Sequence, residues 1–216
     1  MIQMNKLPFI RNVTRLHSIC LILEGNEEQY YFERLKELSV FSSIYYIKPV
    51  NAKSESSIPA KYYEALSSDS YEIVLIVCDM DREPIEYNKV VYGIDRILGE
   101  GRSKNVIIFT RPCTLQVILS HFGEVNLTTQ SKKAAQPDVE RLTGVKKYDA
   151  HKDQLEEICG KIFQKSYKPM KQRVESIGDD PNNIPSSNIL RLFQWLESND
   201  PKWIDDINTL IHRDSE

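Results

Sequence analysis

The sequence predicts an α/β fold: a parallel β-sheet flanked by helices, followed by a C-terminal helical appendage. Two short apolar runs, residues 18–23 and 72–78, lack the polar alternation of half-exposed strands and end in loop-forming residues, as buried parallel strands do. Strand-like and helix-like segments alternate four times up to residue 110. Such alternation favours parallel strands joined by right-handed crossovers.

The elements of the α/β half follow from local patterns. Tyr31, Leu35 and Leu38 recur at helical spacing, and Pro112 opens a segment whose apolar stripe predicts a helix packed on the sheet. That stripe consists of Leu115, Ile118, Leu119 and Phe122. In order, we expect a strand at 18–23, a helix at 27–38, a strand at 44–50, a helix at 58–67, a strand at 72–78, a helix at 86–98 and a strand at 105–110.

The C-terminal half carries helical signals only. Residues 149–164 are amphipathic, residues 167–177 suggest a second helix, and Ser187 is placed to cap a helix over 188–197. A last short helix is expected at 203–211. We therefore expect an α/β domain over residues 1–125 and a helical region over residues 126–216 packed on it.

Composition excludes several classes of protein. With 216 residues, 41% hydrophobic and 27% charged, the chain is no disordered tail, collagen-like fibre or long coiled coil. The longest strictly apolar run has six residues, against about 20 for a membrane span, and the N-terminus lacks an apolar signal-peptide core. These features predict a cytoplasmic protein without a membrane partner. The four scattered cysteines are expected to be buried thiols.

Familiar nucleotide and zinc motifs are missing from the sequence. Neither a Gly-x-Gly-x-x-Gly nor a Gly-x-x-x-x-Gly-Lys-Ser/Thr pattern occurs, which argues against classical dinucleotide and ATP sites. No histidines have the His-x-x-x-His spacing of a zinc site. His121, at the end of an apolar stripe, and the aromatic pair Tyr31 and Phe32 are expected to be structural.

Charge is concentrated in one segment. The formal net charge is only −3, yet residues 131–173 carry eleven basic and six acidic residues. One interpretation is a strip that contacts nucleic-acid phosphates, and the other is the solvated face of two helices. The expected nucleic-acid-binding residues are Lys132, Lys133, Lys146, Lys147 and Lys152.

Acidic residues follow two of the predicted strands. Glu24 and Glu28 come after the first, and Asp79, Asp81 and Glu83 come after the third. Ligands of open α/β sheets bind beyond the carboxyl ends of the strands, and hard carboxylate oxygens suit Mg²⁺ or Mn²⁺. These five residues are therefore candidate metal ligands. The alternative is that acidic residues simply favour the starts of helices.

The same residues resemble a known family. A Toprim domain of the RloB-like type is characterised by Glu-Gly, then Thr-Glu, then Tyr-Phe, and later Asp-x-Asp. The corresponding residues here are Glu24-Gly25, Glu27-Glu28, Tyr31-Phe32 and Asp79-Met80-Asp81. A further family stretch, Asn-Pro-Cys-Phe-Glu with a later Leu-His-Phe, is matched at Pro112, Cys113, His121 and Phe122 but not at Arg111, Thr114 and Leu115. The resemblance covers roughly residues 18–122.

The resemblance implies metal-dependent phosphodiester chemistry. It assigns Glu24, Asp79 and Asp81 as catalytic, with Glu24 as general acid or base and the two aspartates holding Mg²⁺ or Mn²⁺. RloB-like proteins and the related overcoming-lysogenization-defect nucleases are associated with defence against phage. The chain is thus expected to be an endonuclease acting on DNA or RNA in that defence.

Two other functions stay open at this point. Leu115 replaces a family glutamate, which favours a catalytically weak adaptor or sensor that works with an ATPase subunit, and a homo-oligomer is compatible with either role. A third reading is a protein that binds a nucleotide polyphosphate through the same metal loops.

Overall fold

The structure is a computed structural model that describes residues 16–212, so the expectation about a signal peptide lies outside the described residues. Five strands occur in this range: β1 (His17–Leu23), β2 (Tyr45–Asn51), β3 (Ile73–Asp79), β4 (Ile107–Arg111) and β5 (Ser186–Ser187). The helices of the first half are α1 (Asn26–Glu37), α2 (Ile58–Ser67), α3 (Ile85–Leu98) and α4 (Leu115–Leu119). Those of the second half are α5 (Lys132–Thr143), α6 (Lys152–Gly160), α7 (Gln164–Ile177), α8 (Ile189–Glu197) and α9 (Lys202–His212).

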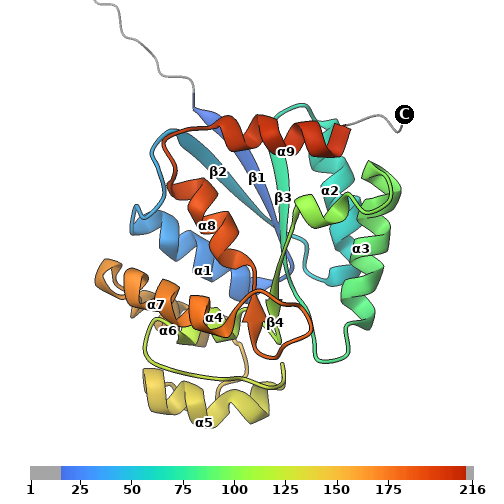
Figure 1. Cartoon of the computed structure of the whole chain (residues 1–216). Coiled ribbons are helices and arrows are strands. Elements are labelled where there is room, and N and C mark those ends of the chain that lie inside the picture. The colour runs from blue at the N-terminus through green and yellow to red at the C-terminus, as the bar shows by residue number, and fades with distance from the viewer. Residues whose placement is uncertain (1–15, 213–216) are drawn as a thin grey trace, which may run out of the picture.

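The strands form one sheet in the order β2-β1-β3-β4-β5, in which only β5 is antiparallel to its neighbour. Helices cover both faces of the sheet: α1 and α8 lie on one, and α2 and α3 on the other (Figure 1). The predicted α/β fold with a mostly parallel sheet is therefore confirmed, and its strand order is consistent with a Toprim-like fold.

The core explains why the apolar runs became strands. The side chains of β1 from Ile19 to Leu23 and those of β3 from Val74 to Cys78 are at most 2% exposed, because helices cover both faces of the sheet. Tyr31 and Phe32 of α1 are fully buried, as expected. All four cysteines are buried free thiols, which confirms that prediction.

Helices α2 and α3 meet at a glycine. A Cβ atom added at Gly93 of α3 would lie 2.7 Å from the Pro59 ring of α2, and that rigid ring cannot swing aside. We expect Gly93→Ala to lower the free energy of unfolding by about 1–3 kcal/mol, the usual cost of overpacking. The control Gly160→Ala, which adds a Cβ in open space, should be neutral or slightly stabilising. Urea denaturation measures both, and equal stability of the two variants would contradict close packing here.

The C-terminal half departs from expectation at three places. The segment 149–164 is not one helix, because α6 ends at Gly160 and α7 begins at Gln164. Arg34 of α1 donates to the Ile162 carbonyl oxygen from Nε (3.1 Å) and Nη2 (2.8 Å), so the break is held by a tertiary contact. Helix α5 was not predicted, because Pro137 and a mostly polar sequence mask it.

The third departure is strand β5, which was not predicted. Its two residues pair with Thr110 and Arg111 of β4 and extend the sheet, so the C-terminal region contributes to both the sheet and the hydrophobic core. Asn188 rather than the expected Ser187 is the N-cap residue of α8, although Ser187 Oγ accepts from the Ile189 amide at 3.1 Å. Within residues 16–212, no helix combines the length and the apolar character that crossing a membrane requires.

Candidate metal centre

The acidic loops meet at the point where the connections of the sheet diverge. From β1 the chain turns through α1 to β2, whereas from β3 it turns through α3 to β4 on the other face (Figure 1). Crevices of this kind, beyond the carboxyl ends of neighbouring parallel strands, are where α/β proteins bind ligands. Glu24 directly follows β1, and Asp79 is the last residue of β3.

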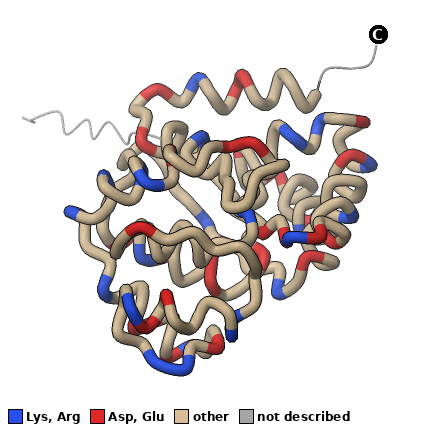
Figure 2. Tube along the Cα trace, turned by 60° about the horizontal axis from the view of Figure 1, so that its bottom comes forward, with Lys and Arg blue, Asp and Glu red and all other residues tan. Residues whose placement is uncertain are grey.

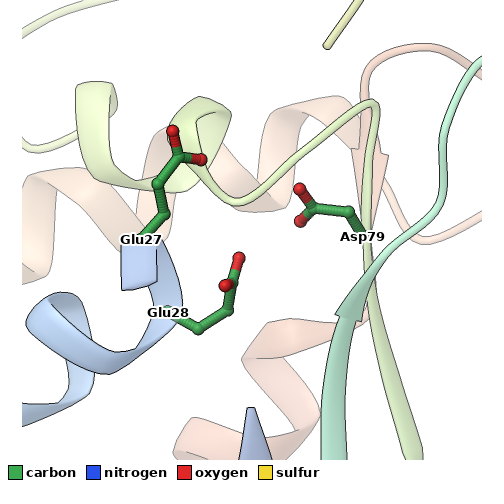
Figure 3. A group of neighbouring side chains, drawn as sticks. All are labelled: Glu27, Glu28 and Asp79. Carbon is green, nitrogen blue, oxygen red and sulfur yellow. The ribbon is translucent and has the colours of Figure 1, made fainter. Parts of the chain in front are cut away.

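Three carboxylates gather at this crevice. Glu27, Glu28 and Asp79 each offer an oxygen, and these oxygens lie within 4.8 Å of one another. Figure 3 shows Glu27 and Glu28 rising from the first turn of α1 and Asp79 facing them from the end of β3. A pocket of about 210 Å³ opens beside them, lined also by Glu24 and Lys132.

Asp79 is held by several donors. Its Oδ1 accepts from Thr110 Oγ1 at 2.8 Å, from the Thr114 amide at 2.7 Å and from Thr114 Oγ1 at 3.0 Å. Thr110 stands opposite Asp79 in the sheet, and Thr114 lies just before α4. Burial raises the pKa of Asp79 well above its usual range, Glu28 and Glu24 add to the rise, and Thr110 opposes it.

Glu28 caps its own helix from inside the protein. Its Oε2 accepts from the Gly25 amide at 3.0 Å, so the side chain curls back over the start of α1. The residue is 3% exposed. Burial raises its pKa, and neighbouring Glu27 adds to the rise, while Thr114 opposes it. A cation bound beside Glu28 would favour its charged form and so oppose this rise in pKa.

Glu27 is engaged by two donors from the C-terminal half. Lys132 forms an ion pair with its Oε1, and the Tyr148 hydroxyl donates to the same oxygen at 2.6 Å. Although burial opposes it, Glu27 raises the pKa of Lys132 above its usual range. The lysine is therefore a firmly charged neighbour of the carboxylates.

Glu24 lies behind Asp79 rather than among the three. Its Oε2 accepts from the Asp79 amide at 2.8 Å. Burial raises the pKa of Glu24 to about 9, with contributions from Glu28 and from Glu55, which lies within hydrogen-bonding reach; the Asp79 amide opposes the rise. At neutral pH the metal-free protein keeps a proton on Glu24, which agrees with a general acid.

Asp81 and Glu83 lie further along the loop after β3. Asp81 is partly exposed, and its pKa is raised by burial and by Glu55, while Lys132 lowers it. Glu83 is exposed. Neither is a member of the three-carboxylate group, nor is Glu24, so their expected role as ligands stays a prediction. Arg111 Nη2 donates to the Arg82 carbonyl oxygen at 2.8 Å and ties down this loop.

The donor set suits a small, hard cation. All three groups are carboxylates, the ligands that Mg²⁺ and Mn²⁺ prefer. Two ligands of Mg²⁺, each at about 2.0–2.1 Å, lie at most roughly 4.2 Å apart, so oxygens within 4.8 Å need only small side-chain movements. Glu27, Glu28 and Asp79 thus fit the implied metal.

The basic segment reaches the metal centre at one end. Helices α5 and α6 lie at the carboxyl ends of the strands (Figure 1), and Lys132 contacts Glu27 there. Seen from that end, basic and acidic residues are interspersed (Figure 2). Lys133, Lys146, Lys147 and Lys152 are all exposed, and two of them form ion pairs, Lys146 with Glu140 and Lys152 with Glu156. Nucleic-acid binding by these five lysines stays a prediction.

Two residues singled out in the sequence are structural. His121 is 5% exposed and bonds to Tyr31 Oη at 3.0 Å and Ser166 Oγ at 2.8 Å. Burial, with Arg173 nearby, lowers its pKa to about 3, so the ring is neutral. Leu115 is 1% exposed and belongs to the hydrophobic core.

Sequence reasoning missed five contributors to the site: Glu27 and Glu55 as acidic members, and Thr110, Thr114 and Tyr148 as donors. Glu27 had a local signal, because it directly precedes Glu28 in the first turn of a helix that starts at the sheet edge. Glu55 and Tyr148 had none, since they arrive from segments 31 and 124 residues away from Glu24.

Fold and site together define a class: α/β proteins with buried carboxylates at the carboxyl edge of a mostly parallel sheet. Comparison with known proteins adds no narrower assignment, because no family model, curated protein or solved structure matches the chain.

Proposed function

We propose that this protein is a Mg²⁺- or Mn²⁺-dependent nuclease that cleaves phosphodiester bonds of DNA or RNA. One observation carries the proposal: Glu27, Glu28 and Asp79 converge at the divergence point of a Toprim-like sheet. Burying three carboxylates together is costly unless a cation compensates them, and Lys132 supplies only one positive charge. The resemblance to RloB-like proteins supports a place in defence against phage.

The residues around the centre have separable tasks. A divalent ion bound there would neutralise charge on a non-bridging phosphate oxygen. Glu27, Glu28 and Asp79 would hold that ion, with Asp79 fixed by Thr110 and Thr114. Glu24, with its raised pKa, is suited to protonate the leaving oxygen.

Metal removal tests this function. Purified protein is incubated with plasmid, tRNA and single-stranded DNA in Mg²⁺, Mn²⁺ or EDTA. We expect cleavage of at least one substrate with metal and none in EDTA, with activity restored by adding excess metal. Cleavage that persists in EDTA, or none under any condition while phage protection persists in cells, would argue against a nuclease.

A second candidate is an adaptor or sensor subunit that works with an ATPase partner. The observation that favours it is the buried Leu115 at the family's glutamate position, which removes one carboxylate. The two functions separate in cells: an adaptor keeps its partner and its protection when the metal centre is disabled, whereas a nuclease loses protection.

A further inference from the structure

The metal centre is joined to a separate segment of the chain. Lys132 is the first residue of α5, and Tyr148 lies in the loop between α5 and α6. Both contact the same oxygen of Glu27, which is 7% exposed. One carboxylate oxygen therefore receives an ammonium group and a hydroxyl group from residues more than 100 positions away in the sequence.

We propose that Lys132, the first residue of α5, is a built-in cation that competes with the divalent metal for Glu27 and covers the centre until metal displaces its side chain. This inference rests on the proposed metal-dependent function. Its physical basis is that Glu27 Oε1 already accepts hydrogen bonds from the Lys132 ammonium group and the Tyr148 hydroxyl, which an incoming metal must displace to use that oxygen. The ammonium group sits on a flexible four-carbon stem, so it can leave without unfolding the helix.

The attachments of α5 would allow such a movement at one end. At its C-terminal end, Lys161 Nζ donates to the Thr143 carbonyl oxygen at 2.8 Å. Val139 in the middle of α5 and Ala135 one turn after Lys132 are buried in the core. At its N-terminal end, Val125 and Leu127 are buried and bonded to Gln116, whereas residues 128–131 have no helix or strand and lie next to the ion pair of Lys132 with Glu27 of α1. Release of Lys132 would free its side chain and loosen the residues before Ala135, while the rest of α5 stays anchored.

The test compares metal affinities. Mn²⁺ binding is measured by isothermal titration calorimetry for the wild type, Lys132→Met and Lys202→Met, the last removing an exposed lysine of α9 at the opposite end of the sheet. Methionine keeps an apolar stem and removes the charged ammonium group together with its hydrogen bond to Glu27. We expect Lys132→Met to bind Mn²⁺ roughly tenfold more tightly than the wild type, the factor that corresponds to about 1.4 kcal/mol. Lys202→Met should match the wild type.

Hydrogen exchange gives a second readout that needs no substrate. Amides at the start of α5 should exchange faster in Lys132→Met without metal, and in the wild type when Mn²⁺ is saturating. Tyr148→Phe, which loses the hydroxyl and keeps the ring, should bind Mn²⁺ two- to threefold more tightly. This second variant keeps the test valid if Lys132→Met does not fold.

The outcomes separate this inference from the proposed function. Equal or weaker Mn²⁺ binding by Lys132→Met, with the wild type binding metal, overturns the competition and leaves the metal centre standing. Binding by none of the variants overturns both. Tighter binding together with faster exchange at the start of α5 supports the competition.

Discussion

Asp79→Asn is expected to abolish metal-dependent cleavage and to weaken Mg²⁺ binding at least about a hundredfold. Asparagine keeps an oxygen that can accept from Thr110 Oγ1 and the Thr114 amide, so the local geometry survives. It removes the negative charge that a divalent ion requires. Since burial and Glu28 disfavour the charged form of Asp79 in the metal-free protein, the melting temperature without metal should stay equal or rise. Calorimetry, a plasmid cleavage assay and thermal denaturation measure the three effects.

The alanine variant should behave differently from asparagine. Sequence reasoning alone predicts that removing Asp79 costs little stability, because carboxylates repel. The structure revises this for Asp79→Ala, which leaves the Thr114 amide and the Thr110 hydroxyl without their acceptor, at about 1–3 kcal/mol. The control Asp206→Asn, an exposed aspartate of α9, should leave cleavage and metal affinity unchanged. An Asp79→Asn protein that still cleaves with Mg²⁺ would disprove the assignment.

The stability of the metal-free protein is expected to fall as pH rises. Burial and neighbouring carboxylates raise the pKa of Glu24 from 4.5 to about 9. The folded state thus holds a proton that the unfolded state has lost above pH 4.5. The stabilising effect is full below pH 4.5 and is lost progressively toward pH 9. The difference is on the order of a few kcal/mol, and Glu28 and Asp79, whose pKa values are also raised, act in the same direction.

Glu24→Gln isolates this effect. The glutamine oxygen can still accept from the Asp79 amide, but no proton is gained or lost. We expect the variant to be more stable than the wild type at pH 9, on the order of 2–3 kcal/mol or roughly 5–10 °C in melting temperature, and similar to it at pH 4.5. Saturating Mg²⁺ should also raise the melting temperature of the wild type at pH 9, since the ion binds only the folded state. Identical pH profiles for Glu24→Gln and the exposed control Glu100→Gln would contradict burial of an ionisable Glu24.

Local sequence patterns sufficed for most of the α/β half. The runs that became β1 and β3 are continuous and apolar because both faces of the sheet are covered, so burial leaves a signal in the sequence itself. Helix α2 spans residues 58–67 as its pattern predicts. The prediction of one helix over 149–164 was wrong because the amphipathic pattern continues through Lys161 and Ile162. The contact that holds the break comes from Arg34 of another helix.

The acidic edge was predictable for the same reason. Carboxylates that directly follow two parallel strands must emerge at one edge, so Glu24, Glu28 and Asp79 could be placed there from their positions alone. Which oxygens share a centre depends on side-chain direction. Glu24 turns to the Asp79 amide, and Glu27 takes its place beside Glu28 and Asp79.

The sequence by itself determined the four parallel strands, the helices that cover them and the edge at which the acidic residues gather, because these follow from periodicity and from the position of each residue relative to a strand end. Only the tertiary structure decided that Lys132 and Tyr148 contact Glu27 and that Glu55 lies beside Glu24. Such contacts depend on how a distant segment packs against the sheet, and no local pattern of apolar and polar residues encodes that packing.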